Sequence, residues 1–66
     1  MGIDHRRLLT PFELDVLELY AEGYKAPEIA DRLGITRRTV KNYSDRLRGK
    51  LGARTMAQAV AMVLAP

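Results

Sequence analysis

The chain has 66 residues and no cysteine, so it is one small domain without disulfides, a thiol nucleophile or a thiolate metal site. Its 47% hydrophobic and 29% charged residues are typical of a folded protein, and the absence of paired catalytic groups and of a phosphate-binding loop argues against an enzyme. The net charge is +3. No apolar run approaches the roughly 20 residues that span a bilayer, so we expect a cytoplasmic protein. With no cysteine and one histidine, His5, we expect no metal and no cofactor.

The first half of the chain contains start and stop signals for two helices. Thr10 and Glu13 have the spacing of a capping box, which predicts a first helix over about 10–22. Pro27 suits a first helical position and Gly34 suits a left-handed helix end, so a second helix of barely two turns is expected between them.

Two further helices are predicted in the second half. Thr36 is expected to cap a helix over 37–51, whose apolar residues recur at helical spacing and face the core. These residues are Val40, Tyr43, Leu47 and Leu51. Thr55 and Gln58 have the spacing of a second capping box, which opens a nearly all-apolar last helix over 56–64. No strand alternation appears, so the predicted fold is all-α.

Basic residues gather in the second half of the chain. Residues 1–35 carry four bases and seven acids, whereas residues 36–66 carry seven bases and one acid, Asp45. At about 100° per residue, the outward side of the predicted helix 37–51 carries Arg38, Lys41, Asn42, Asp45 and Gly49, flanked by Arg37 and Arg48 on one edge and by Thr39, Arg46 and Lys50 on the other. A solvated helix face is the alternative, but acids normally alternate with bases there, so the pattern favours contact with a polyanion.

The second and third helices have the order of a helix-turn-helix, in which a short helix and a tight turn precede the helix that enters the DNA major groove. The turn is Gly34-Ile35-Thr36. Many helix corners with a glycine turn bind no nucleic acid, so this order alone leaves both readings open. The cationic outward face favours DNA.

Several short motifs at fixed spacing resemble the LuxR/FixJ/GerE-type DNA-binding domain. They include Leu9-Thr10-Pro11, Glu28-Ile29-Ala30, Leu33-Gly34-Ile35, Thr39-Val40-Lys41-Asn42 and Lys50-Leu51-Gly52, and the likeness extends roughly over residues 8–65. The resemblance implies a four-helix domain over 9–66 after an N-terminal arm over 1–8, a homodimer formed through the last helix, and regulation of transcription in a bacterium or phage. Most members carry a further sensor or receiver domain, so both a stand-alone regulator and part of a longer one are open.

The resemblance also assigns roles by position. It implies base contacts from Lys41, Asn42 and Asp45, and backbone contacts from Thr36, Thr39 and Lys50. Lysine suits guanine and asparagine suits adenine, while Arg38 has the choice of a base or a phosphate. Further phosphate contacts are expected from Lys25, Arg37, Arg46 and Arg48. Asp45 either accepts from cytosine N4 or pairs with Lys41 or Arg48 at helical spacing.

The last predicted helix has two apolar faces. One face carries Ala59, Val60 and Val63, and the other carries Ala57, Ala61 and Leu64. A domain this small has one core, which takes only one of these faces. By the family pattern we expect the first face in the core and the second in a two-fold contact between subunits.

Two other functions remain open from the sequence. The promoter-recognition helix-turn-helix of sigma factors shares the Leu-Thr-Pro and Gly-Ile-Thr features, and it would act with RNA polymerase as its partner. A protein-interaction adaptor would use Phe12, Leu14 and Leu19, with the basic helix merely solvated. Phe12 itself either packs locally on Ile3 and Leu8 or belongs to a patch that binds a partner.

Overall fold

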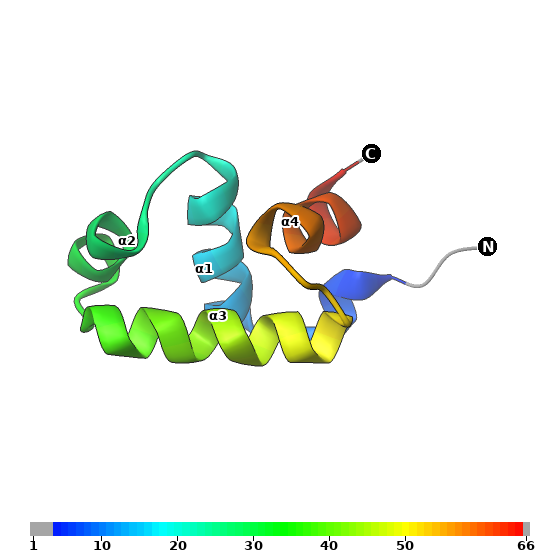
Figure 1. Cartoon of the computed structure of the whole chain (residues 1–66), viewed down its shortest axis with the longest axis horizontal. Coiled ribbons are helices and arrows are strands. Elements are labelled where there is room, and N and C mark those ends of the chain that lie inside the picture. The colour runs from blue at the N-terminus through cyan, green and yellow to red at the C-terminus, as the bar shows by residue number, and fades with distance from the viewer. Residues whose placement is uncertain (1–3, 66) are drawn as a thin grey trace.

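The computed structural model describes residues 4–65, which form four α-helices after one short 3-10 helix. The elements are η1 (His5–Leu8), α1 (Pro11–Ala21), α2 (Ala26–Leu33), α3 (Arg37–Leu51) and α4 (Met56–Leu64). The described residues contain no strand, and the predicted all-α fold is confirmed. In Figure 1, α3 lies along one side of the molecule, with α2 at its N-terminal end and η1 at its C-terminal end.

The helix starts follow the predicted caps. Thr10 Oγ1 accepts the Glu13 N–H at 3.2 Å, and Glu13 Oε1 accepts the Thr10 N–H at 2.8 Å, which completes the capping box of α1. Thr36 Oγ1 accepts the Thr39 N–H at 3.1 Å and caps α3. Gly34 ends α2 in the left-handed region at φ +68°, a conformation that favours glycine. These local contacts set the tight turn between α2 and α3.

At α4 the second predicted capping box is only half correct. Thr55 Oγ1 accepts the Gln58 N–H at 3.0 Å, as predicted. Gln58 Oε1, however, accepts the Arg54 N–H at 2.8 Å, where the prediction had the Thr55 N–H. The glutamine side chain therefore satisfies a donor one residue earlier in the turn.

Two clusters of buried side chains hold the helices together. The larger joins α1, α3 and α4 and contains Val16, Leu17, Leu47, Leu51, Ala59 and Val63, and the smaller joins α2 to α3 and contains Ile29, Ala30 and Val40. Because each turn of α3 is anchored from behind, its opposite side stays in solvent. The predicted apolar stripe of α3 is confirmed, with Tyr43 half-buried at its edge.

Ser44 is a buried polar residue of α3 that the apolar stripe did not predict. Its hydroxyl donates to the Val40 carbonyl oxygen at 2.9 Å and lies 3.3 Å from the Tyr20 hydroxyl oxygen. The bond to the preceding turn of the same helix satisfies the hydroxyl, so burial leaves no unpaired group there.

The described part of the predicted arm packs on the domain. Residues 5–8 form η1, which contacts α3 and α4. Ile3 lies outside the described residues, and so does its expected contact with Phe12. Leu8 is exposed, and the Phe12 ring packs on Tyr43 with the ring centres 4.8 Å apart. None of the helices in residues 4–65 is long and apolar enough to cross a membrane.

Candidate nucleic-acid interface

The outward side of α3 carries the four side chains predicted to read bases. Arg38, Lys41, Asn42 and Asp45 are all exposed. Lys41 and Asn42 each lie three or four residues from both Arg38 and Asp45, so the four side chains share one stripe of the helix. Behind them the fully buried Val40 and Leu47 fix the rotation of α3. The structure therefore brings these four side chains together on a rigid support.

Asp45 is held by two bases of its own helix. Its carboxylate pairs with Lys41 Nζ at 3.2 Å and with the guanidinium of Arg48. The hydrogen bond from Lys41 outweighs partial desolvation and, with the charges of both bases, lowers the pKa of Asp45 below its ordinary value. Arg48 also donates to the Arg54 carbonyl oxygen at 3.4 Å, which ties the end of α3 to the following turn. Asp45 was expected either to accept from cytosine or to pair with Lys41 or Arg48, and the structure contains ion pairs with both bases.

Lys50, predicted to contact the DNA backbone, has a partner inside the domain. Its Nζ lies 2.7 Å from Oε1 of Glu13, whose side chain is buried at the start of α1. Burial alone raises the pKa of Glu13. The hydrogen bond and charge of Lys50 and the hydrogen bonds with Thr10 together lower it by more, so the pKa lies below its ordinary value. The pair joins the N-terminal end of α1 to the C-terminal end of α3.

The N-terminal end of α3 concentrates positive charge. Arg37 and Arg38 occupy its first turn, where the helix dipole is already positive, and that turn contains no acid. The hydroxyls of Thr36 and Thr39 lie 2.9 Å apart beside them. Lys25, at the N-cap of α2, is exposed, and its side chain makes no capping bond. The first turn of α3 is therefore suited to bind an anion.

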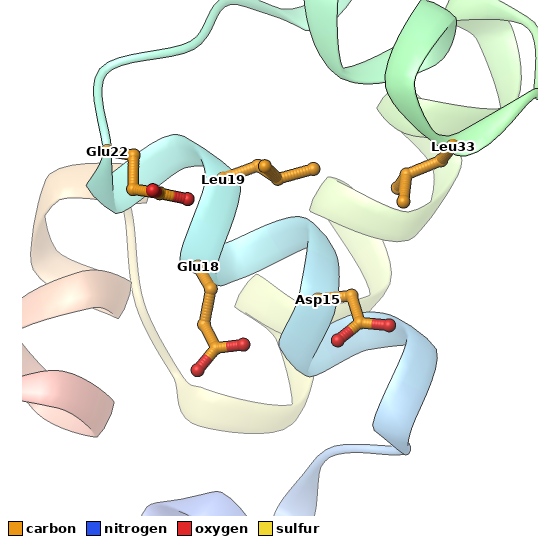
Figure 2. Close-up of a pocket in the computed structure, with 5 residues that line it drawn as sticks. All are labelled: Asp15, Glu18, Leu19, Glu22 and Leu33. Atoms are coloured by element: carbon orange, nitrogen blue, oxygen red, sulfur yellow. The ribbon is translucent and has the colours of Figure 1, made fainter.

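Negative charge gathers between α1 and α2. A shallow pocket of about 200 Å³ is lined by Asp15, Glu18, Glu22, Leu19 and Leu33. Figure 2 shows the two leucines, one from each helix, pointing toward each other beside the three carboxylates. The volume falls below the range of about 300–1,000 Å³ for small-molecule sites, and the carboxylates repel phosphate. The charge distribution thus leaves the α3 side as the one suited to a polyanion.

Residues 4–65 contain no group of three or more His, Asp or Glu side chains placed to hold a metal ion.

The side of α4 that faces the core was assigned correctly in its main members. Ala59 and Val63 are buried, and Val60 is half-buried against the larger cluster. Ala57 and Ala61 are exposed, one turn apart on the outer side. Leu64 is half-buried and packs partly on the core from the end of the helix. An apolar, small-residue surface is therefore left uncovered on α4.

Comparison with known proteins identifies the family. The sequence pattern described as "Bacterial regulatory proteins, luxR family" matches residues 7–63. The chain belongs to the LuxR family of bacterial regulatory proteins. The family resemblance predicted from the motifs is confirmed, and the family comprises regulators, not enzymes.

Individual relatives of this LuxR family domain differ in length. The chain is 45% identical over 51 residues to the DNA-binding transcriptional activator DevR/DosR of Mycobacterium tuberculosis, which covers 77% of this chain and 24% of that protein. It is 44% identical over 55 residues to the response regulator RamR of Streptomyces coelicolor. That match covers 83% of this chain and 27% of RamR. It is 39% identical over 57 residues to the spore germination protein GerE of Bacillus subtilis, with 86% and 77% covered. The chain thus spans about a quarter of the first two relatives and about three quarters of GerE. No solved structure matches the chain.

Some contacts of the LuxR family domain were not predicted from its sequence. Glu13 was recognised only as a capping residue, although it is also the partner of Lys50, 37 positions away. Tyr43 was assigned to the core, but the Arg46 guanidinium lies over its ring, 5.4 Å from the centre. The spacing of Tyr43 and Arg46, three residues apart on a helix, is a signal from which the second contact is predictable.

Proposed function

We propose that this chain binds double-stranded DNA in a sequence-specific manner and acts as the DNA-binding domain of a transcriptional regulator, with α3 in the major groove. The observation that carries the proposal is the exposed polar stripe on α3, backed along its length by buried apolar residues. Membership of a family of bacterial regulators supports it, as does the name of a relative that is a DNA-binding transcriptional activator.

The side chains on the stripe have chemistry suited to base edges. Lys41 suits the O6 and N7 acceptors of guanine, and Asn42 suits the N6 and N7 pair of adenine. Arg38, at the exposed start of α3, has the reach for a base or a neighbouring phosphate. Asp45 is already paired with Lys41 and Arg48, so we assign it the role of holding these two bases.

Backbone phosphates are assigned to the flanks of this stripe. The proposed contacts are those of Lys25, Thr36, Arg37, Thr39, Arg46, Arg48 and Lys50. The charges of Arg48 and Lys50 are already compensated by Asp45 and Glu13, so their contribution should be smaller than that of Arg37.

We further propose that the chain acts as a homodimer through α4, with Ala57, Ala61 and Leu64 at the two-fold contact. Ala57 and Ala61 are exposed in the single chain, which supports this assignment. RNA polymerase is a further candidate partner, as in the promoter-recognition alternative.

Selection of bound duplexes from a random DNA pool tests the proposal. We expect one consensus sequence, and an affinity that falls as salt rises because each neutralised phosphate releases condensed counterions, at a logarithmic slope of about −0.9 per contact. An adaptor with a merely solvated basic helix binds no duplex even at low salt. Failure to bind any DNA under those conditions would therefore contradict the proposed function.

Replacing Lys41 with alanine tests the reading role of α3. We expect a loss of about 1–3 kcal/mol on the selected duplex and relaxed preference at one base position, because a base-edge contact contributes discrimination as well as attraction. The matched control is Arg37→Ala, which should weaken selected and random duplexes equally. If Lys41→Ala behaves like the control, Lys41 contacts only the backbone.

Replacing Asp45 with asparagine distinguishes its two interpretations. Loss of the carboxylate frees Lys41 and Arg48 and removes a charge that repels phosphate. We therefore expect tighter binding to every duplex and a salt slope steeper by about one to two counterions. Asp45→Glu, which keeps the charge, serves as the control. A change in the base selected at one position would instead show that Asp45 reads DNA.

A further inference from the structure

The bases of α3 differ in what holds them. Lys41 and Arg48 are paired with Asp45, and Lys50 is paired with Glu13. In the part of the chain that the structure describes, Arg37 and Arg38 have no ion-pair or cation–π partner. Arg46 belongs to neither group, because an aromatic ring holds its guanidinium and no carboxylate of residues 4–65 forms an ion pair with it.

The support under Arg46 comes from two helices. The guanidinium carbon of Arg46 lies 5.4 Å from the centre of the Tyr43 ring, within the distance of about 6 Å for a cation–π contact. The Tyr43 ring in turn packs on Phe12 of α1, with the ring centres 4.8 Å apart and the planes inclined by 37°. Both rings are half-buried and pack against the larger core cluster.

The N-terminal end of α1, which carries Phe12, is itself anchored. The residue after Phe12 is Glu13, whose carboxylate is bonded to Lys50 near the other end of α3. A continuous set of contacts therefore runs from the α1–α3 junction through two rings to one exposed cation beside the polar stripe.

A ring and a carboxylate have different consequences for an arginine. A carboxylate uses the N–H edge of the guanidinium and cancels its charge, whereas a ring contacts the planar face and leaves the edge donors and the charge available. That edge matches two oxygens of a phosphate at once. An arginine already oriented by a ring also loses less rotamer freedom on binding than an unsupported one.

We propose that Phe12 and Tyr43 are positioning residues that hold Arg46 as a preoriented clamp for one phosphodiester of the DNA backbone. This inference rests on the proposed function and extends it to the aromatic pair, to which neither the helix-turn-helix order nor the charge count assigns a role.

A double-mutant cycle between Tyr43→Leu and Arg46→Ala tests the proposal, with affinity measured on the selected duplex and on a random duplex over a range of salt. Arg46→Ala should reduce the salt slope by about one counterion on both duplexes. Tyr43→Leu should weaken both by about 2- to 5-fold, because an Arg46 without the ring loses more rotamer freedom on binding. In the Arg46→Ala background, Tyr43→Leu should cause no further loss.

Two further variants separate the ring from other effects. Tyr43→Phe keeps the ring and should bind as the wild type does; a loss equal to that of Tyr43→Leu would show that the hydroxyl contacts DNA and would overturn the proposal. Phe12→Leu keeps an apolar side chain under Tyr43 and should cause a smaller loss that also vanishes without Arg46. It provides the cycle if Tyr43→Leu does not fold, as judged by circular dichroism.

The outcomes separate this inference from the function on which it rests. Losses for Tyr43→Leu and Arg46→Ala that simply add would show that Tyr43 acts through the fold, which overturns the clamp while leaving DNA binding intact. A wild-type chain that binds neither duplex at low salt would overturn the proposed function and the clamp together.

Discussion

Replacing Lys50 with methionine should lower the free energy of unfolding by about 2–3 kcal/mol. The substitution leaves the Glu13 carboxylate buried without its cation, and breaking a fully buried pair costs about 3–5 kcal/mol. We expect less than this because the Lys50 side chain is 35% exposed, so solvent already screens the pair. The free energy of unfolding of a native protein is only about 5–15 kcal/mol, so urea denaturation resolves this loss easily.

The matched control is the double variant Glu13→Gln with Lys50→Met. Glutamine keeps the capping-box bond to the Thr10 N–H but carries no charge, so most of the stability should return. If Lys50→Met alone stays within about 0.5 kcal/mol of the wild type, where ordinary surface substitutions fall, the pair does not stabilise the fold.

The same pair predicts an opposite pH dependence in the two proteins. In the wild type the pKa of Glu13 lies below its ordinary value of 4.5, so the unfolded chain takes up the proton first, and stability is lost as the pH falls through the folded pKa. In Lys50→Met, burial without the cation should raise the pKa of Glu13, so protonation relieves the penalty. The difference between the two proteins should therefore shrink between pH 7 and pH 4.

Local spacing was sufficient to predict the helices because their ends depend on neighbours in sequence. The Thr10 and Thr36 caps, the turn at Gly34 and the outward stripe of α3 follow from periods of three and four residues. Contacts across the fold follow no such period. Glu13 and Lys50 meet only because α1 and α3 pack at a particular height, which depends on the whole core.

The same limit applies to the charge on α3. The sequence shows seven bases and one acid in residues 36–66, and the count alone treats the bases as equivalent. Packing gives these bases different partners. Glu13 of α1 compensates the charge of Lys50, whereas the Tyr43 ring, which packs on Phe12 of α1, holds Arg46. The position of the basic side of α3 was therefore predictable, but the division of its cations by partner was not.

Replacing Ala61 with glutamate should abolish cooperative binding to a duplex with two half-sites. Ala59 and Val63 fill the core side of α4, so the exposed Ala61 is free to face a second subunit. Small side chains let two helices approach closely, and at a two-fold contact one substitution opposes two like charges. Because linked sites exceed single-site affinity by about 10²–10⁴-fold, the apparent affinity should fall by about 100-fold or more.

The exposure of Ala61 keeps this test separate from folding. The glutamate should leave the helical circular dichroism unchanged, whereas the affinity for a single half-site should fall only slightly, through the added negative charge. Ala61→Ser, which is small and uncharged, is the control and should keep most of the cooperativity. A folded Ala61→Glu variant that still binds two half-sites cooperatively would mean that the subunits meet through another surface, and the outer side of α4 would then face solvent on DNA as well.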